Sequence, residues 1–290
     1  MDICLLVSGN LGYKILLEVC LAYNVRCVLT DRQSEEIISF CKLKDIVFFA
    51  GNPRNGKISD LINKVKIDVI LSINYLFLID HQIIHWPRKY AINIHGSLLP
   101  KFRGRTPHVW AIINNEKETG ITAHLIDEGC DTGPIISQLR ISIEDNDTGA
   151  SLLEKYKEKY PELVRRVLEG ASNGTLELKA QDHSKATYFS KRTPEDGEIN
   201  WNWQKERIFN WVRALAHPYP GAFTYFNEKR IRINKVVFSN IGYSDNVDNG
   251  SILMIEDGNP IVKTQNGAIK IVNFDLDPGF KVNGKFYGKY

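Results

Sequence analysis

The sequence lacks a hydrophobic run that could cross a membrane. Its longest apolar stretch, residues 69–79, is interrupted by Ser72 and Asn74 and flanked by Asp68 and Asp80. A helix that spans a bilayer needs about 20 consecutive apolar residues. The first eight residues contain no basic side chain, and their apolar run is too short for a signal peptide. We therefore expect a soluble protein of the cytoplasm that has no membrane partner.

The sequence also lacks an excess of charge of one sign. It contains 37 lysines and arginines against 34 aspartates and glutamates, for a net charge of +3 at pH 7. The basic residues are scattered among acidic ones, whereas a protein that holds nucleic acid usually gathers them on one face. This balance indicates that nucleic acid is not a partner.

Cysteines are few, and none of them form a C-x-x-C pair. The five are Cys4, Cys20, Cys27, Cys41 and Cys130. An odd number without paired spacing indicates reduced thiols rather than a disulfide framework. No metal is expected either. His81 and His85 have the spacing of the two histidines in H-E-x-x-H, but Gln82 replaces the glutamate and no third ligand is evident.

Short apolar runs alternate with helical patterns over the first part of the chain. We expect strands at residues 3–7, 25–29, 47–49, 69–73 and 91–95, and helices at 11–22, 34–42, 58–64 and 80–85. This alternation is typical of an α/β fold with a doubly wound, mostly parallel sheet, which binds ligands beyond the carboxyl ends of its strands. Two β-rich runs follow within residues 119–140, joined by a loop at 127–134. A helix over 149–168, capped by Asp147 or Thr148 and stopped by Gly170, completes the first domain.

The last third of the chain has a different pattern. Residues 181–200 are polar and contain Pro194 and Gly197, which indicates a linker. A helix at 203–214 and short strands at 222–226, 231–238, 251–256, 260–264 and 268–274 are typical of a small antiparallel barrel. We therefore expect a catalytic domain over residues 1–180, a linker over 181–200, and a helix with a small OB-like β domain over 201–290.

Residues suited to chemistry gather where the strand at 91–95 ends. Asn93 and His95 are two residues apart, so their side chains point to the same face of the sheet. The loop that follows carries positive charge that could meet a phosphorylated ligand, on Lys101, Arg103 and Arg105. Spacing alone does not connect this strand with Asp131, thirty-six residues further on, which would otherwise be read as a solvated carboxylate in a loop.

The segment NIHGSLLP at residues 93–100, followed by Asp131, Thr132 and Gly133, resembles the folate-dependent formyltransferases. Further strings of this family stand at residues 101–105, 119–122, 191–197, 212–215 and 218–223. The later strings resemble the nucleotide-sugar branch. That branch includes the formyltransferase half of the bacterial enzyme acting on UDP-4-amino-4-deoxyarabinose, and the stand-alone dTDP-sugar N-formyltransferases. The resemblance implies that Asn93, His95 and Asp131 form one active site.

The resemblance also implies a reaction. It is the transfer of a formyl group from 10-formyltetrahydrofolate to the amine of a nucleotide-linked (dTDP-type) amino-dideoxy sugar, for surface polysaccharide such as lipopolysaccharide O-antigen. Formyl transfer needs a neutral amine, stabilisation of an oxyanion and a proton for the departing nitrogen. Asn93 could donate to the oxyanion. His95 could remove the amine proton or stabilise the oxyanion, and Asp131 could orient the imidazole or organise water for proton relay.

Binding residues follow from the same resemblance. The folate donor is expected to contact Tyr75, Leu76, Phe77, Leu78, Asp127 and Gly129. The sugar nucleotide is expected at the basic loop described above and at Arg192, Trp201, Arg213, Tyr219 and Phe223. An arginine fork suits a diphosphate, and an aromatic ring can stack on a base. The branch commonly pairs through its smaller domain, so a homodimer is expected.

Other functions stay open at this point. Methionyl-tRNA formyltransferase is the nearest alternative, but it would need a more basic surface to hold tRNA. A purine-pathway glycinamide ribonucleotide formyltransferase would lack the second domain. A folate- or nucleotide-binding module without turnover is possible if the catalytic residues do not converge. The sequence does not specify the base, the sugar or the position of its amine.

Overall fold

The computed structural model describes residues 1–244 and 246–288, and the chain divides into two compact units. Unit 1 comprises Met1–Gly104, Gly120–Ile141 and Lys155–Phe189; unit 2 comprises Arg105–Thr119, Ser142–Glu154 and Ser190–Tyr290. The units therefore interleave along the chain. The domain boundaries at residues 180 and 200 stay a prediction.

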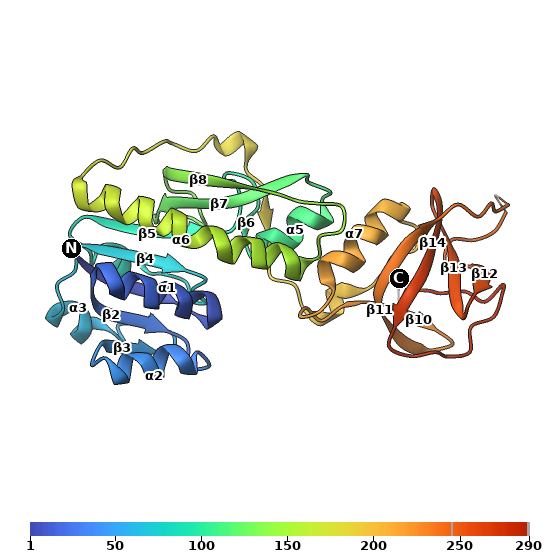
Figure 1. Cartoon of the computed structure of the whole chain (residues 1–290), viewed down its shortest axis with the longest axis horizontal. Helices are drawn as coiled ribbons and strands as arrows, with labels where there is room; N and C mark the ends of the chain where they lie inside the picture. Colours follow the sequence, from blue (N-terminus) through green and yellow to red (C-terminus); the bar gives the residue numbers. More distant parts are fainter. Residues whose placement is uncertain (245, 289–290) are drawn as a thin grey trace. The chain divides into compact units, whose positions relative to one another are not determined.

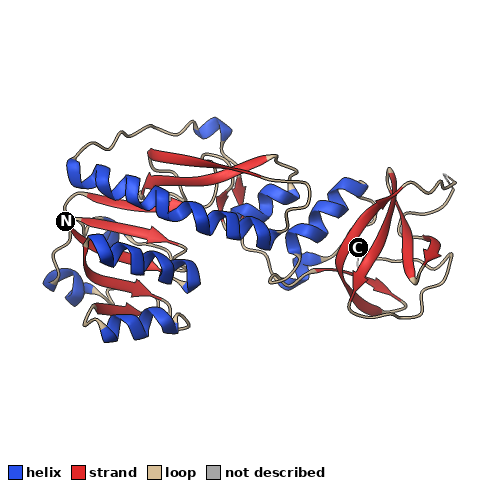
Figure 2. Ribbon diagram, in the orientation of Figure 1, coloured by secondary structure: helices blue, strands red, loops and turns tan. Residues whose placement is uncertain are grey.

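Unit 1 is built around a seven-stranded sheet with helices packed against it (Figures 1 and 2). The strand order is β3-β2-β1-β4-β5-β7-β8. Their bounds are β1 (Asp2–Val7), β2 (Asn24–Thr30), β3 (Val47–Ala50), β4 (Val69–Ile73), β5 (Tyr90–His95), β7 (Glu118–Leu125) and β8 (Ile135–Ser142). Neighbouring strands from β3 to β5 are parallel, and β5 pairs with β7 in the antiparallel sense. The predicted α/β fold with a mostly parallel sheet is confirmed.

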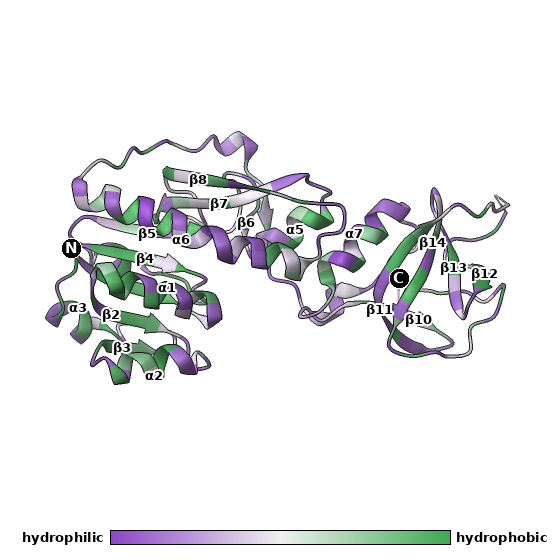
Figure 3. Cartoon of the chain, viewed as in Figure 1, coloured by the Kyte–Doolittle hydropathy of each residue, from purple (hydrophilic) through white to green (hydrophobic). Residues whose placement is uncertain are grey.

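The connections between the parallel strands are helical, as predicted. They are α1 (Gly9–Ala22), α2 (Glu35–Leu43), α3 (Ser59–Lys64) and α4 (His81–Ile84). The strands that they connect are apolar over nearly their whole length, since both faces of a parallel sheet are covered (Figure 3). Residues of β1, β2 and β4, among them Leu6, Leu29 and Ile70, share one buried apolar cluster. This core places the carboxyl ends of β4 and β5 at one edge of the sheet.

The helix α6 (Gly149–Asn173) is longer than predicted. Thr148, one of the two residues predicted to cap the start of this helix, is its N-cap. Its hydroxyl accepts a hydrogen bond from Ser151 N at 3.1 Å. The predicted end at Gly170 is wrong, because Ala171 is still fully buried and packing carries the helix past the glycine. The helix ends before Gly174, whose φ of +69° suits a left-handed cap residue.

Unit 2 is built from a five-stranded sheet and the helices α5 (Pro107–Ile113) and α7 (Lys205–Leu215), together with the first residues of α6. The sequence patterns did not predict α5, because seven residues are too few to show a period. The strands lie in the order β10-β11-β14-β13-β12, and every neighbouring pair is antiparallel. They are β10 (Ala222–Phe226), β11 (Lys229–Ser239), β12 (Ile252–Glu256), β13 (Asn259–Thr264) and β14 (Gly267–Phe274). The predicted antiparallel β domain is confirmed.

The segment over residues 181–200 carries short elements of its own. It contains η1 (His183–Lys185), β9 (Tyr188–Phe189) and η2 (Pro194–Gly197), and β9 pairs in parallel with β6 (Arg103–Gly104). Across the described ranges, no helix combines the length and the apolar character that a membrane crossing requires.

Candidate active site

Four polar side chains meet at the carboxyl end of β5 in unit 1. Asn93 and His95 come from β5, His124 from β7, and Asp131 from the loop between β7 and β8. Asn93 lies directly opposite His124 in the antiparallel ladder, with Asn93 Nδ2 3.2 Å from His124 Nε2. The Asp131 carboxylate lies 3.5 Å from His95 Nδ1 and 3.6 Å from His124 Nε2. The structure thus brings the three predicted catalytic residues together, with a second histidine among them.

The second histidine orients the amide of Asn93. His124 Nδ1 lies 2.7 Å from the carbonyl oxygen of Leu125, which can only accept, so this nitrogen carries the hydrogen. Nε2 faces one N–H group of the Asn93 amide at 3.2 Å and the Asp131 carboxylate at 3.6 Å, so the ring lies between these two groups. The other N–H group of that amide keeps its donor capacity for a ligand.

Asp131 is held as a carboxylate. Its side chain is only 15% exposed. Burial opposes its ionisation, but His95, His124 and the Gly104 N–H more than compensate and hold the pKa of Asp131 well below its usual value. The Gly104 N–H donates to Asp131 Oδ2 at 2.9 Å. Asp131 is therefore ionised across the neutral range.

His95 is fixed by a backbone carbonyl. Its Nε2 lies 2.8 Å from the carbonyl oxygen of Phe102, so Nε2 carries a hydrogen, and its Nδ1 faces Asp131. His95 is buried, and only 7% of the residue is exposed. An imidazole between a carbonyl and a carboxylate can hold a proton next to a developing negative charge. The cluster can thus donate hydrogen bonds and move a proton at one place.

The residues predicted to bind the donor lie on two loops of unit 1. After β4, Leu76 and Leu78 are 45% and 67% exposed, whereas Tyr75 and Phe77 turn inward and meet edge to face. On the other loop, Asp127 accepts from Gly129 N and from Thr132 Oγ1, so its carboxylate holds the loop itself. A Cβ at Gly129 would lie 1.9 Å from Thr132 Oγ1, so only glycine fits there.

The residues predicted to bind the sugar nucleotide fall into two groups, and their role stays a prediction. Buried ones are already engaged within the protein: Arg103 with Gln181, Arg213 with the carbonyls of Glu144 and Asp147, Trp201 with Thr224, and Phe223 under the guanidinium of Arg230 at 3.7 Å. More accessible ones are Lys101, Arg105, Arg192 and Tyr219.

A pocket of about 390 Å³ opens in unit 2 beside Arg192. Indole rings form much of its wall, from Trp110, Trp203 and Trp211. The guanidinium of Arg192 lies 5.1 Å from the centroid of the Trp110 ring, and its buried Nε has no hydrogen-bond partner among the described residues. Burial lowers the pKa of Arg192. The pocket therefore offers flat aromatic surfaces and an unused donor.

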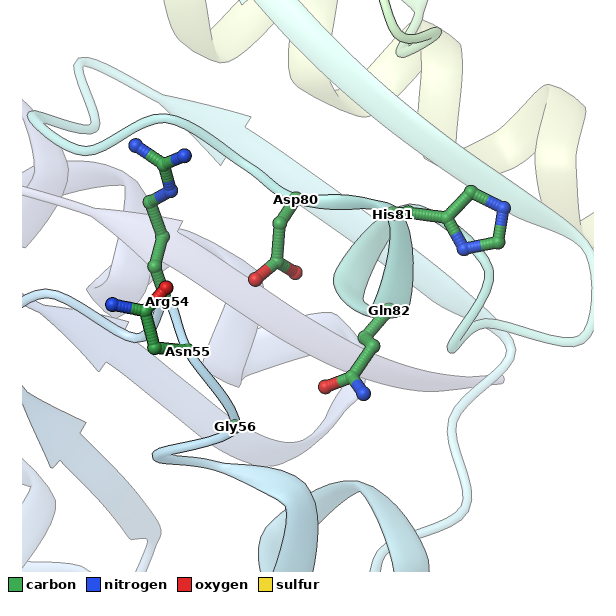
Figure 4. Close-up of a pocket in the computed structure, with 6 residues that line it drawn as sticks. All are labelled: Arg54, Asn55, Gly56, Asp80, His81 and Gln82. Atoms are coloured by element: carbon green, nitrogen blue, oxygen red, sulfur yellow. The ribbon is translucent and has the colours of Figure 1, made fainter.

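A second hollow, of about 310 Å³, lies between the loop after β3 and the start of α4 (Figure 4). Its lining includes Arg54 and Asp80, and Asp80 also accepts from Ile83 N to cap α4. His81 points away from the other labelled side chains and lies against His85, with ring centroids 4.1 Å apart. Within residues 1–244 and 246–288, no group of three or more potential ligands could hold a metal ion.

The sequence reasoning missed His124. His124 is two residues after Thr122, so the two side chains share one face of the strand. Which residue of β5 lies opposite His124 depends on the register between β5 and β7. Together with Asn93, His95 and Asp131, His124 completes a site that can stabilise an oxyanion and move protons. The cluster lies at the carboxyl edge of a mostly parallel α/β sheet, where enzymes of this fold class bind their ligands.

The chain belongs to the formyl transferase family. Residues 14–168 match the formyl transferase domain, and residues 191–287 match the formyl transferase C-terminal domain. The chain is 37% identical over 266 residues to the bifunctional polymyxin resistance protein ArnA of Wigglesworthia glossinidia brevipalpis. That alignment covers 88% of this chain but 39% of the relative, so the chain spans about two fifths of its length.

Solved structures share the fold at lower identity. One is an N-formyltransferase from Helicobacter canadensis in complex with folinic acid and dTDP-3-aminofucose, with a TM-score of 0.74 and 21% identity, covering 93% of this chain and 98% of that one. Another is WlaRD, a sugar 3N-formyl transferase, with a TM-score of 0.73 and 23% identity, covering 93% and 96%. At these identities the likeness shows the fold.

Proposed function

We propose that the protein transfers a formyl group from 10-formyltetrahydrofolate to the amine of a nucleotide-linked amino sugar, with a dTDP-linked amino-dideoxy sugar of surface polysaccharide as the first candidate. The observation that carries this proposal is the cluster of Asn93, His95, His124 and Asp131 in a chain of the formyl transferase family. The N-formyltransferase from Helicobacter canadensis, which shares this fold and was solved in complex with folinic acid and dTDP-3-aminofucose, supports the choice of substrates.

The donor supplies the electrophilic formyl carbon. The loop after β4 and the loop of Asp127 and Gly129 offer apolar surface for its flat ring system and polar groups for the amide edge of that ring. Leu76 and Leu78 present apolar surface on the loop after β4. The hydroxyl of Tyr75 is buried without a hydrogen-bond partner among the described residues, and burial raises its pKa, so it stays a donor. The backbone around Asp127 and Gly129 offers further polar groups.

The cluster then does the chemistry by position and charge. The second N–H of Asn93 donates to the formyl oxygen as negative charge develops there; in other enzymes one such donor contributes about 2.7 to 4 kcal/mol. His95 donates from Nε2 to the Phe102 carbonyl, which fixes the ring with Nδ1 toward Asp131. The bond from the amine nitrogen to the formyl carbon replaces the bond from that carbon to the departing nitrogen of the donor. The proton lost by the amine passes through the cluster or a water to the departing nitrogen, while Asp131, ionised at neutral pH, supplies the counter-charge.

The pocket in unit 2 supports binding of the nucleoside part of the acceptor. Its lining contains Lys191 and Arg192 but also Glu195, Asp196 and Glu198, so acidic side chains outnumber basic ones. Carboxylates repel a diphosphate but accept hydrogen bonds from ribose hydroxyls and base N–H groups. A base between indole rings would gain about 1 to 3 kcal/mol from stacking. Arg105, an exposed cation of the same unit, is then a candidate for the phosphates.

The test is a turnover screen with the whole chain and 10-formyltetrahydrofolate. The acceptors are dTDP- and UDP-linked sugars with the amine at C3 or C4, and methionyl-tRNA. Mass spectrometry of the products should show formylation of at least one amino sugar, faster than of methionyl-tRNA. Faster formylation of the tRNA would reverse the choice of acceptor. Binding of folate and nucleotide without any product would identify a binding module instead.

A further inference from the structure

A segment far from the catalytic residues in sequence lies against their loops. Residues 181–189, here called the strap, follow α6 and return along unit 1 as a mostly extended chain (Figure 1). The strap includes η1 and β9 and ends unit 1. It contacts the loop after β5, which fixes His95, and the loop that carries Asp131.

The side-chain centre of this contact is Arg103. Arg103 is 0% exposed, and its guanidinium donates to Gln181 Oε1 at 2.7 Å and to the hydroxyl of Tyr188. It also lies 3.2 Å from His183 Nδ1, and 5.3 Å from the centroid of the Tyr188 ring. All of these partners belong to the strap. A buried cation held in this way is costly to move, because its donors would lose their acceptors.

Gln181 links this cation to the second loop. Its amide nitrogen donates to the carbonyl oxygens of Asp131 at 2.9 Å and Gly133 at 2.7 Å. The single side chain therefore accepts from the loop of Arg103 and donates to the loop of Asp131. It is 7% exposed, so water competes little for these bonds.

Backbone contacts reinforce the same attachment. Thr187 accepts from Arg103 N with its carbonyl oxygen, at 2.9 Å, and from Phe102 N with its hydroxyl, at 2.8 Å. The rings of Phe102 and Phe189 stack with centroids 5.2 Å apart. A Cβ at Gly104 would lie 2.2 Å from the carbonyl oxygen of Phe189, which shows how closely the two backbones approach.

The residues on either side of Arg103 contact the catalytic groups. Phe102 accepts from His95 through its carbonyl, and Gly104 donates to Asp131. Phe102 and Asp131 have φ angles of +59° and +54°, in the left-handed region that non-glycine residues rarely adopt. Such backbone persists only where surrounding contacts hold it. The strap supplies those contacts.

We propose that the strap sets the catalytic geometry, with Arg103 and Gln181 as positioning residues for His95 and Asp131. Neither residue needs to touch a substrate. The kinetic part of this inference rests on the proposed formyl transfer, whereas the structural part does not. Misplacement of a reacting group by about 1 Å can lower a rate about a hundredfold.

The test compares Gln181→Ala with Lys185→Ala, which removes an exposed ion pair to Asp182 from the same strap and leaves Gln181 in place. Gln181→Ala should lower kcat about ten- to a hundredfold, with KM for both substrates changed less than about threefold. Lys185→Ala should match the wild type. Gln181→Met, similar in length, replaces Gln181→Ala if the latter does not fold.

A third variant separates positioning from folding. Gln181→Glu keeps an acceptor for Arg103 but places a carboxylate oxygen against the carbonyls of Asp131 and Gly133. If the side chain served only to anchor Arg103, this variant would be stable and fully active. We expect instead a folded protein with a kcat reduced at least about tenfold. A wild-type kcat in Gln181→Glu or Gln181→Ala would overturn the proposal.

Amide hydrogen exchange gives a readout that does not depend on activity. The N–H of Gly104, which bonds Asp131, should exchange at least about tenfold faster in Gln181→Ala than in Lys185→Ala, because local opening becomes easier. Unchanged protection at Gly104 would overturn the proposal. If the wild type formylates no acceptor, the proposed function fails, and the exchange result still decides the role of the strap.

Discussion

Replacement of Asp131 by asparagine tests the active site most directly, because it removes one charge and almost no volume. The asparagine oxygen can still accept from Gly104 N, but the residue no longer places a negative charge against His95 Nδ1. If Asp131 accepts or balances the transferred proton, kcat should fall about 10²- to 10⁴-fold. Steady-state kinetics with the best acceptor of the screen measures this loss.

The same substitution has a signature in stability. The pKa of Asp131 in the folded protein lies below its value in the unfolded chain, so its charge stabilises the fold above the unfolded pKa. That contribution is lost as the pH falls from about 4 through the folded pKa. Hydrogen bonds to a charged group are worth about 1.5 to 3 kcal/mol, so Asp131→Asn should cost about that much at pH 7. The gap should shrink at pH 3.

Urea unfolding of wild type and Asp131→Asn at pH 7 and at pH 3 gives the difference in their free energies of unfolding at each pH. Asp145→Asn is the matched control, since this carboxylate is 89% exposed and pairs with Lys117 on the surface. The control should leave kcat unchanged. A kcat for Asp131→Asn within threefold of wild type, or a stability gap as large at pH 3 as at pH 7, would refute the reasoning.

Three further substitutions have distinct expected outcomes, and a fourth, at Gly174, is the control for the third. His124→Leu removes the ring nitrogens that hold the catalytic amide, so kcat should fall about ten- to a hundredfold with little change in KM, as measured by steady-state kinetics. Trp203→Ala should raise KM for the sugar nucleotide about five- to a hundredfold and leave kcat and the folate KM largely intact. Gly104→Ala, at φ +101° and 2.2 Å from the Phe189 carbonyl, should cost about 2 to 4 kcal/mol in urea unfolding. Gly174→Ala, at φ +69° in open space, should cost about 1 kcal/mol.

Local pattern was enough to predict the sheet and half of the catalytic cluster. Buried parallel strands are continuous apolar runs, and β4 was predicted over the same residues that form it. The period of two put Asn93 and His95 on one face. Asp131 was joined to them only through family resemblance. His124 was missed because its partner depends on the register of β5 against β7, which no local pattern encodes.

Arg103 shows a different limit. Basic residues in a glycine-containing loop are normally exposed, so Arg103 was predicted to meet a phosphate together with Lys101 and Arg105. The structure buries it completely against acceptors about eighty residues later in the chain, which are neutral and give no charge signal in the sequence. Only the path of the strap decides that this arginine turns inward.

The positions that defeat local reasoning are also those closest to the chemistry. Phe102 and Asp131 occupy left-handed backbone, where sequence rules favour glycine or asparagine. Each such residue costs about 1 to 3 kcal/mol and is kept only because other contacts offset it. Here the conformation turns the Phe102 carbonyl to His95 and lets Gly104 N meet Asp131. The two partners that fix the imidazole and the carboxylate are therefore backbone groups, and their directions are set by conformations that the contacts of the strap hold in place.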